Sequence, residues 1–307
     1  MSDVVAVTGA TGFIGRHLLD SLTHKNFKIK ALTRKPQTTI GSIDWITGDL
    51  LNTDSLEELV RDADIIIHCA GQVRGNNYQG FEKTNVVGTE NLIQAIEKQN
   101  QSPRFLMISS LAAREPHLSW YAKSKYQSEQ VLVKSRGKFK WSILRPTAVY
   151  GPGDKELMPL LKATTKGLLP MINTPESKFG LIYVDDLILA INNWIESKSA
   201  DGKIYELDDG SPGGYDQFKL KEIASQVWGK KVRIIPIPVM LVKVIANINL
   251  HLSRILDYLP MLTPEKVREL THHDWVSTNS HFTDDTGWLP KTLLKDGLEK
   301  AILSDRH

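Results

Sequence analysis

The chain has 307 residues, 41% of them apolar, which is enough for one large or two moderate globular domains. Lys and Arg number 38 against 35 Asp and Glu, and the basic residues are scattered, which excludes the basic footprint of a nucleic-acid-binding protein. The one cysteine, Cys69, excludes an internal disulfide and favours a reducing compartment, so we expect a cytoplasmic protein.

Short apolar runs alternate with helical patterns in the first half, which is typical of a parallel sheet covered by helices on both faces. Strands are predicted at residues 4–8, 28–33, 43–47, 64–70, 104–109 and 141–146. Helices are predicted near residues 13–24, 53–61, 80–99 and 121–135. The pattern predicts an α/β fold with a doubly wound Rossmann-type parallel sheet. Such sheets bind ligands beyond the carboxyl ends of the strands, where the strand order reverses.

The segment VTGATGFIG joins the first predicted strand to the first predicted helix. Gly9 permits a sharp turn, Gly12 lets the backbone approach a pyrophosphate, and Gly15 lets the helix pack against the strand. The free N–H groups at the start of the helix attract phosphate. The sequence therefore predicts a dinucleotide-binding turn rather than a glycine-rich turn without a ligand.

The second strand ends ALTRKP, where the acidic residue that often binds the ribose 2′-hydroxyl of NAD is missing. Without that carboxylate a 2′-phosphate is not repelled, and Arg34 could clamp it with paired hydrogen bonds. We therefore predict NADP in preference to NAD. The alternatives, in which Arg34 stacks on adenine or faces solvent, stay open.

Later motifs make the pattern specific: GDL at residues 48–50, HCAG at 68–71, LRPTAVYGPGD at 144–154 and YVDDL at 183–187. Together with the glycine motif they resemble the extended branch of the short-chain dehydrogenase/reductase superfamily, the NAD-dependent epimerase/dehydratase-like family. The resemblance covers nearly the whole chain. It implies further cofactor contacts at Thr11, Phe13, Ile14, Asp49, Leu50, Cys69, Ala70, Gly71, Asn85, Ser109, Pro146, Thr147 and Val149.

The segment SSLAAREPHLSWYAKSK holds the predicted catalytic residues Ser110, Tyr121 and Lys125. Residues four apart share one face of a helix, so Tyr121 and Lys125 can act on the same bound molecule. We expect Lys125 to hold the nicotinamide ribose and, as a cation, to lower the pKa of Tyr121 towards working pH. The resemblance implies that Ser110 binds the substrate oxygen and that Tyr121 transfers a proton while hydride moves to or from nicotinamide.

Two departures from the family's sugar-nucleotide enzymes bear on the reaction. Ala148 stands where those enzymes commonly carry an Asn that helps to hold the diphosphate. Leu111 and Ala112 follow Ser110 where dehydratases carry an acid and a base. We predict an oxidoreductase that interconverts a hydroxyl and a carbonyl on a small organic substrate. A nucleotide-sugar epimerase with tightly bound NAD, and a non-catalytic dinucleotide-binding scaffold or sensor, remain alternatives.

The second half is less regular, and we predict a smaller substrate-binding lobe from residues 151–179 and 209–307. The dinucleotide-binding core would take residues 1–150, rejoined by about 180–208. The apolar segment 235–260 is interrupted by charged and polar residues, so it predicts an amphipathic helix rather than a membrane span. We expect its apolar face to cover core or a subunit contact rather than a membrane surface.

Substrate contacts are expected at Gln72, Arg74 and Tyr150, which follow the fourth and sixth strands at the same edge of the sheet. The neighbouring histidines in THHDW do not predict a metal site, because adjacent side chains rarely converge on one ion. The resemblance implies a homodimer built through the helices near 80–99 and 121–135.

Overall fold

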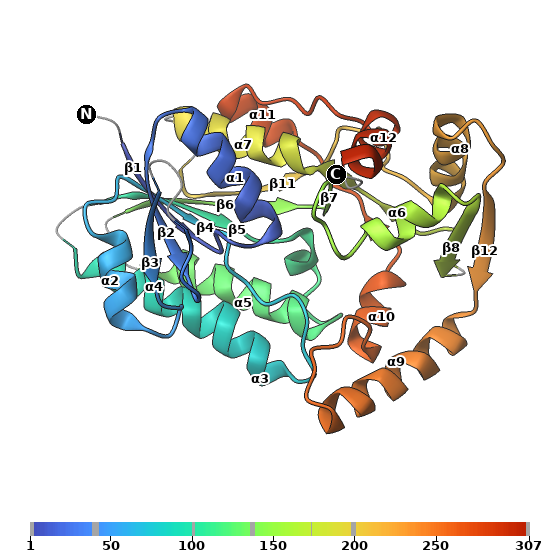
Figure 1. Cartoon of the computed structure of the whole chain (residues 1–307), viewed down its shortest axis with the longest axis horizontal. Coiled ribbons are helices and arrows are strands. Elements are labelled where there is room, and N and C mark those ends of the chain that lie inside the picture. The colour runs from blue at the N-terminus through green and yellow to red at the C-terminus, as the bar shows by residue number, and fades with distance from the viewer. Residues whose placement is uncertain are drawn as a thin grey trace.

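The computed structural model describes residues 3–38, 43–99, 102–135, 139–172, 174–197 and 201–304. Its centre is a seven-stranded parallel sheet with the strand order β11-β6-β5-β4-β1-β2-β3 (Figure 1). The strands are β1 (Val4–Thr8), β2 (Lys28–Thr33), β3 (Ile43–Thr47), β4 (Ile65–His68), β5 (Arg104–Ile108), β6 (Lys140–Pro146) and β11 (Lys203–Leu207). The strand order reverses between β1 and β4, so the doubly wound fold is confirmed.

Helices cover both faces of the sheet (Figure 1). One face carries α1 (Phe13–His24), α7 (Val184–Glu196) and α11 (Ser280–Thr286). The other carries α2 (Thr53–Val60), α4 (Gly88–Glu97) and α5 (Trp120–Lys134). Each face buries its own apolar core, and β4 between them is buried along its whole length. A strand covered on both faces reads as a continuous apolar run, which is why its sequence does not alternate.

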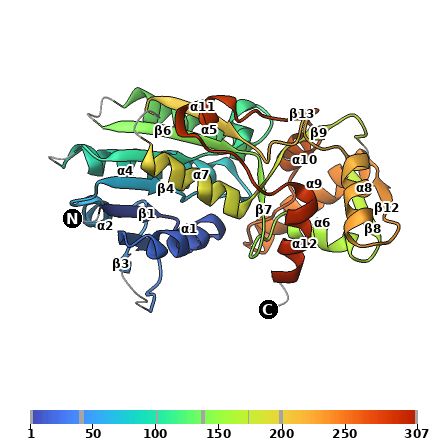
Figure 2. The same cartoon turned by 90° about the horizontal axis from the view of Figure 1, so that it is seen from above.

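A second group of elements lies beyond the carboxyl edge of the sheet (Figures 1 and 2). It contains α6 (Met158–Thr164), β8 (Leu168–Ile172), α8 (Gln217–Val227), β12 (Arg233–Ile237), α9 (Val239–Ile255), α10 (Pro264–Leu270) and α12 (Leu294–Ser304). We call this group the second lobe, and we include in it two short parallel strand pairs. They are β7 (Ala148–Tyr150) with β10 (Leu181–Tyr183), and β9 (Lys178–Phe179) with β13 (Asp274–Trp275).

The predicted amphipathic helix is α9, but its apolar residues do not all face core. Val242, Ala246, Leu250 and Ser253 form its buried face. Most of the remaining apolar side chains are exposed, with Met240 at 73% and Ile248 at 55%. The apolar residues of α9 therefore cover core in part, and the expectation that the rest of them cover a subunit contact stays a prediction. No helix in the described part of the chain is long and apolar enough to span a membrane.

Candidate active site

The glycine turn after β1 has the close backbone packing that its sequence predicts. Gly9 has φ +71°, a conformation that side chains rarely adopt, and a Cβ there would lie 2.5 Å from the Ala70 nitrogen. A Cβ on Gly15 would lie 2.1 Å from the Gly9 carbonyl oxygen, so α1 packs directly against the turn. Gly12 is the residue that precedes α1, and no side chain caps its first N–H groups. This end of α1 is open to an anion.

The loop after β4 is held by Asn85, which is buried in a π-helical segment, η1 (Glu82–Val87). Its amide oxygen accepts from the Gln72 N–H at 2.7 Å, and its amide nitrogen donates to the Gln72 carbonyl and to Ser124 Oγ, at 3.1 and 2.8 Å. These bonds fix the backbone from Ala70 to Gln72 beside the glycine turn. Gly71 is exposed, and a Cβ on it would lie 3.6 Å from Lys125 Nζ. The predicted cofactor residues of this loop therefore adjoin both the glycine turn and Lys125.

The two serines after β5 have different partners. Ser109 is buried, and its hydroxyl donates to the Glu129 carboxylate. Ser110 caps the short 3₁₀ helix η2 (Leu111–Arg114), where it accepts from the Ala112 N–H at 3.2 Å, and it lies close enough to the Tyr121 hydroxyl to lower the pKa of that group. Ser110 is therefore the serine that lies beside Tyr121, whereas Ser109 is bound to Glu129.

Tyr121 lies in the first turn of α5, whose N-terminus is capped by Ser119. Burial raises the pKa of Tyr121 above its ordinary value, and the hydrogen bond from Ser110 opposes that rise only in part. The nearby cation that opposes it is Lys266, whose Nζ lies 5.9 Å from the Tyr121 ring centre. In this structure the pKa of Tyr121 is therefore raised, and the expectation that Lys125 lowers it towards working pH stays a prediction.

Lys125 lies one turn further along α5, with its side chain buried. Its ammonium group donates to the Ile108 carbonyl at 2.8 Å, where β5 ends. Burial lowers the pKa of Lys125 to about 8, although the Glu129 carboxylate raises it in part. A buried ammonium group near the end of β5 can offer its remaining N–H donors to a ligand in the loop region.

A pocket beside Tyr121 is closed on one side by the second lobe. The described residues that line it include the apolar side chains of Val73, Phe81, Trp120, Pro260 and Met261. Two α10 residues, Lys266 and Glu269, also line it and pair with each other, and Glu269 accepts from the Ser119 hydroxyl at 2.7 Å. Sequence reasoning missed these α10 residues, because no local pattern shows that a helix 140 positions later in the chain folds over Tyr121.

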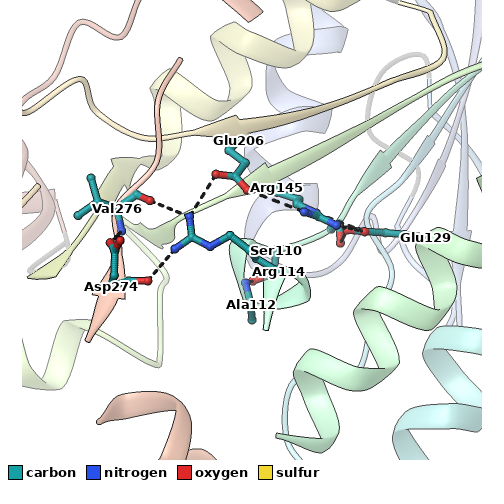
Figure 3. Close-up of polar contacts among 9 residues, drawn as sticks. Ser110, Ala112, Arg114, Glu129, Arg145, Glu206, Asp274 and Val276 are labelled. Carbon is teal, nitrogen blue, oxygen red and sulfur yellow. Dashed lines mark hydrogen bonds and ion pairs between the residues drawn. The ribbon is translucent and has the colours of Figure 1, made fainter. Parts of the chain in front are cut away.

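A chain of charged groups links the catalytic loop to the second lobe (Figure 3). Glu129, whose side chain is fully buried, accepts from the Arg145 guanidinium at 3.0 and 2.6 Å. Arg145 lies 3.8 Å from Glu206, which is also paired with Arg114 at 3.4 Å. Arg114 donates to the Val276 and Asp274 carbonyls at 2.9 and 2.6 Å. The carboxylate that binds Ser109 is therefore part of a network that reaches β13.

The other predicted cofactor residues lie at the same edge of the sheet. Arg34 is exposed at the end of β2. Asp49 is exposed and accepts from the Leu51 N–H at 2.8 Å, whereas Leu50 is buried. The remaining predicted contacts follow β1, β4 and β6: Thr11, Phe13, Ile14, Cys69, Ala70, Pro146, Thr147 and Val149. Burial raises the pKa of the Cys69 thiol to about 12, so Cys69 is no nucleophile.

Among the predicted substrate residues, Tyr150 is wrongly assigned. It is completely buried in the core of the second lobe, with its ring centre 5.4 Å from that of Tyr183, and it is not among the described residues that line the pocket. Arg74 lines the pocket and is paired with Glu156 at 2.7 Å. Gln72 holds the loop, since its side-chain oxygen accepts from the Thr84 hydroxyl at 3.3 Å.

Residues 5–207 match the model of the NAD dependent epimerase/dehydratase family. Among curated proteins, the chain is similar to the ceramide reductase of Caulobacter vibrioides, at 29% identity over 95% of this chain and 98% of that protein. It is also similar to the UDP-glucose 4-epimerase of Vibrio cholerae, at 25% identity over 98% of this chain and 95% of that protein.

Among solved structures, the fold is similar to UDP-glucuronic acid 4-epimerase from Bacillus cereus in complex with UDP-glucuronic acid and NAD. The TM-score is 0.76 at 21% identity, covering 99% of each chain. The predicted fold is confirmed, and so is the predicted class of enzyme, an oxidoreductase or epimerase of the short-chain dehydrogenase/reductase type. The chain belongs to the NAD dependent epimerase/dehydratase family.

Proposed function

We propose that this protein is an NADP(H)- or NAD(H)-dependent oxidoreductase that interconverts a hydroxyl and a carbonyl group on an organic substrate. The observation that carries the proposal is the placement of Ser110 beside the hydroxyl of Tyr121, which lines a pocket, with Lys125 one helical turn further along α5. The ceramide reductase of Caulobacter vibrioides, which is similar over almost its whole length, supports the same reaction type.

Each of the three residues has a separate task in this proposal. Ser110 would hydrogen-bond the substrate oxygen, and Tyr121, which burial keeps protonated, would donate a proton to that oxygen during carbonyl reduction. Lys125 would bind ribose hydroxyl groups through the N–H donors that Ile108 leaves free. When bound, the nicotinamide would supply the hydride in reduction or accept it in oxidation.

The residues present fit a dinucleotide. The glycine turn packs backbone against backbone, because a Cβ on Gly9 or Gly15 would overlap neighbouring backbone atoms. Thr147, after β6, has a buried hydroxyl that lacks a hydrogen-bond partner among the described residues, as a group reserved for a ligand would. The glycine turn and α1 would hold the pyrophosphate, Asp49 and Leu50 would adjoin the adenine, and the loops after β4 and β6 would flank the nicotinamide half.

We propose NADP as the preferred cofactor, because Arg34 is an exposed cation at the end of β2. Binding of both dinucleotides is measured by isothermal titration to the wild type and to Arg34→Ser. NADP should bind more tightly, and the substitution should weaken NADP by about tenfold while leaving NAD unchanged. Tighter binding of NAD by the wild type would reject the preference.

The competing function is a nucleotide-sugar epimerase, which the similarity to the Vibrio cholerae enzyme supports. An epimerase returns the hydride to its substrate, so turnover leaves the nicotinamide absorbance unchanged. One feature favours net oxidoreduction over epimerisation of a nucleotide sugar, because Ala148 offers no amide to a diphosphate. Leu111 and Ala112 after Ser110 are buried and cannot move protons, which argues against a dehydratase. Tyr121→Phe should lower kcat by about 10²–10⁴-fold without changing the folded state. If Tyr121→Phe kept every activity of the wild type, the third alternative, a non-catalytic dinucleotide-binding scaffold or sensor, would be favoured.

We also propose a homodimer through α4 and α5. Their outer surface and the segment before α4 expose Val87, Tyr126 and Val133 at 37%, 37% and 40%, which a subunit contact would cover. A monomer mass in light scattering would contradict this.

The half-buried thiol of Cys69, the only cysteine in the chain, supports a reducing compartment, so we propose a cytoplasmic location.

A further inference from the structure

Helix α9 carries a long apolar strip that no other described part of the chain covers. It consists of Met240, Leu241, Val244, Ile245, Ile248 and Leu252, which are between 42% and 73% exposed. Figure 1 shows α9 on the outer edge of the molecule, with α10 on its inner side. Isolated apolar residues are normal on a protein surface, but a continuous strip along a helix indicates a binding surface.

The helix has three distinct faces when its residues are placed 3.6 to the turn. The buried face, formed by Val242, Ala246, Leu250 and Ser253, packs against the rest of the second lobe, with Val267 of α10 among its contacts. The apolar strip occupies the opposite, outward arc. The third face, between these two, carries Lys243, Asn247, His251 and Arg254, all exposed. An apolar face bordered by basic residues is the pattern of helices that lie in a membrane interface.

Charge points to the chemistry of the partner. Lys243 and Arg254 are the cationic residues of α9, of which Arg254 also donates to the Asn76 carbonyl at 3.4 Å, and the sequence from Val239 to Ile255 contains no acidic residue. Phospholipid headgroups of an anionic bilayer would meet these cations, while the acyl region would receive the strip. A second copy of the chain seated by two-fold symmetry would instead bring the same basic border against itself.

The strip also leads to the candidate active site. Leu256 and Leu259, exposed by 67% and 56%, continue the apolar surface into the loop after α9. The next residues of this loop, Pro260 and Met261, line the pocket beside Tyr121. A bilayer against α9 would therefore lie next to the pocket mouth.

We propose that α9 docks the protein on the surface of an anionic phospholipid bilayer, with the apolar strip in the acyl boundary and Lys243 at the headgroups. This docking does not depend on the reaction proposed above, so either proposal can fail without the other.

Flotation of the full-length protein with lipid vesicles tests the proposal. The protein should float with vesicles of phosphatidylglycerol and phosphatidylcholine and bind pure phosphatidylcholine vesicles more weakly. Ile245→Asn combined with Ile248→Asn should weaken binding by more than about a hundredfold, because both side chains lose apolar burial. Lys243→Gln should weaken binding to the anionic vesicles by about fivefold.

The matched control is Leu289→Asn combined with Leu293→Asn, two exposed aliphatic residues outside α9, which should bind vesicles like the wild type. Thermal unfolding checks that each variant is folded, and Lys243→Gln gives an answer even if the double variant is unstable. Failure of the wild type to float would overturn the proposal, as would equal binding to both vesicle types. A dimer in light scattering that only the Ile245 and Ile248 substitutions dissociate, without vesicle binding, would identify the strip as a self-association surface and also overturn it.

Discussion

Arg145→Met should be among the most destabilising single substitutions in the sheet. It removes the guanidinium that donates to both carboxylate oxygens of Glu129 and leaves that fully buried carboxylate without its cation. Breaking a buried pair in this way costs about 3–5 kcal/mol of unfolding free energy. In a chain of 307 residues that corresponds to a fall in Tm of roughly 5–8 °C.

The assay is unfolding by urea or heat for four proteins. The double variant Arg145→Met with Glu129→Leu should recover more than half of the loss, because it no longer buries an unpaired charge. Lys98→Met is the control, since the pair of Lys98 with Glu57 is largely exposed and should contribute under about 1 kcal/mol. The reasoning is refuted if Arg145→Met unfolds like the wild type, or if the double variant is as unstable as the single one.

Five further substitutions test the site. Burial lowers the pKa of Lys125 to about 8, so its charge lowers the free energy of unfolding below that pH, and this loss fades as the pH rises towards 10.5. Lys125→Met should therefore be inactive and yet unfold at a higher temperature than the wild type near neutral pH. The difference in unfolding temperature should shrink at alkaline pH. Gly15→Ala, whose Cβ would lie 2.1 Å from a backbone oxygen, should lower the free energy of unfolding by about 1–3 kcal/mol and abolish dinucleotide binding. Gly12→Ala, whose Cβ would lie 3.1 Å from a backbone oxygen, should fold and only weaken dinucleotide binding. Equal melting temperatures of the two variants would contradict this. Ser110→Ala should lower kcat with little change in Tm, because Ser110 lies beside the Tyr121 hydroxyl. Ser109→Ala should lower Tm with little change in kcat, because Ser109 binds the buried Glu129 carboxylate. If the two variants have the same kcat and Tm, the catalytic role of Ser110 and the structural role of Ser109 are rejected.

Local patterns were sufficient for the core of the fold. The six predicted strands form β1 to β6, and predicted helices such as 13–24 and 121–135 agree with α1 and α5 to within a residue. Each signal is local, because a buried parallel strand reads as an apolar run and the glycine turn needs its residues at fixed spacing. The same local spacing puts Tyr121 and Lys125 one turn apart on α5, and Tyr121 lines the pocket.

What could not be predicted depends on contacts between distant parts of the chain. Burial raises the pKa of Tyr121, and Glu269 and Lys266 act on it in opposite directions; both of these residues reach the site only through the packing of α10. The burial of Tyr150 depends on Tyr183 and on α12, where Gly297 lies against its ring. An apolar pattern such as that of α9 shows which residues share a face, but not whether the rest of the chain covers that face.

The central claim is net hydride exchange at Ser110, Tyr121 and Lys125. The measurement that tests it most directly is the nicotinamide absorbance of the purified protein with NADP or NAD and a panel of hydroxyl and carbonyl compounds that includes ceramide and UDP-glucose. Conversion of a panel compound should change the absorbance in equal molar amount, and Tyr121→Phe should abolish the change. Conversion of UDP-glucose to its epimer with no net change in absorbance would contradict the claim.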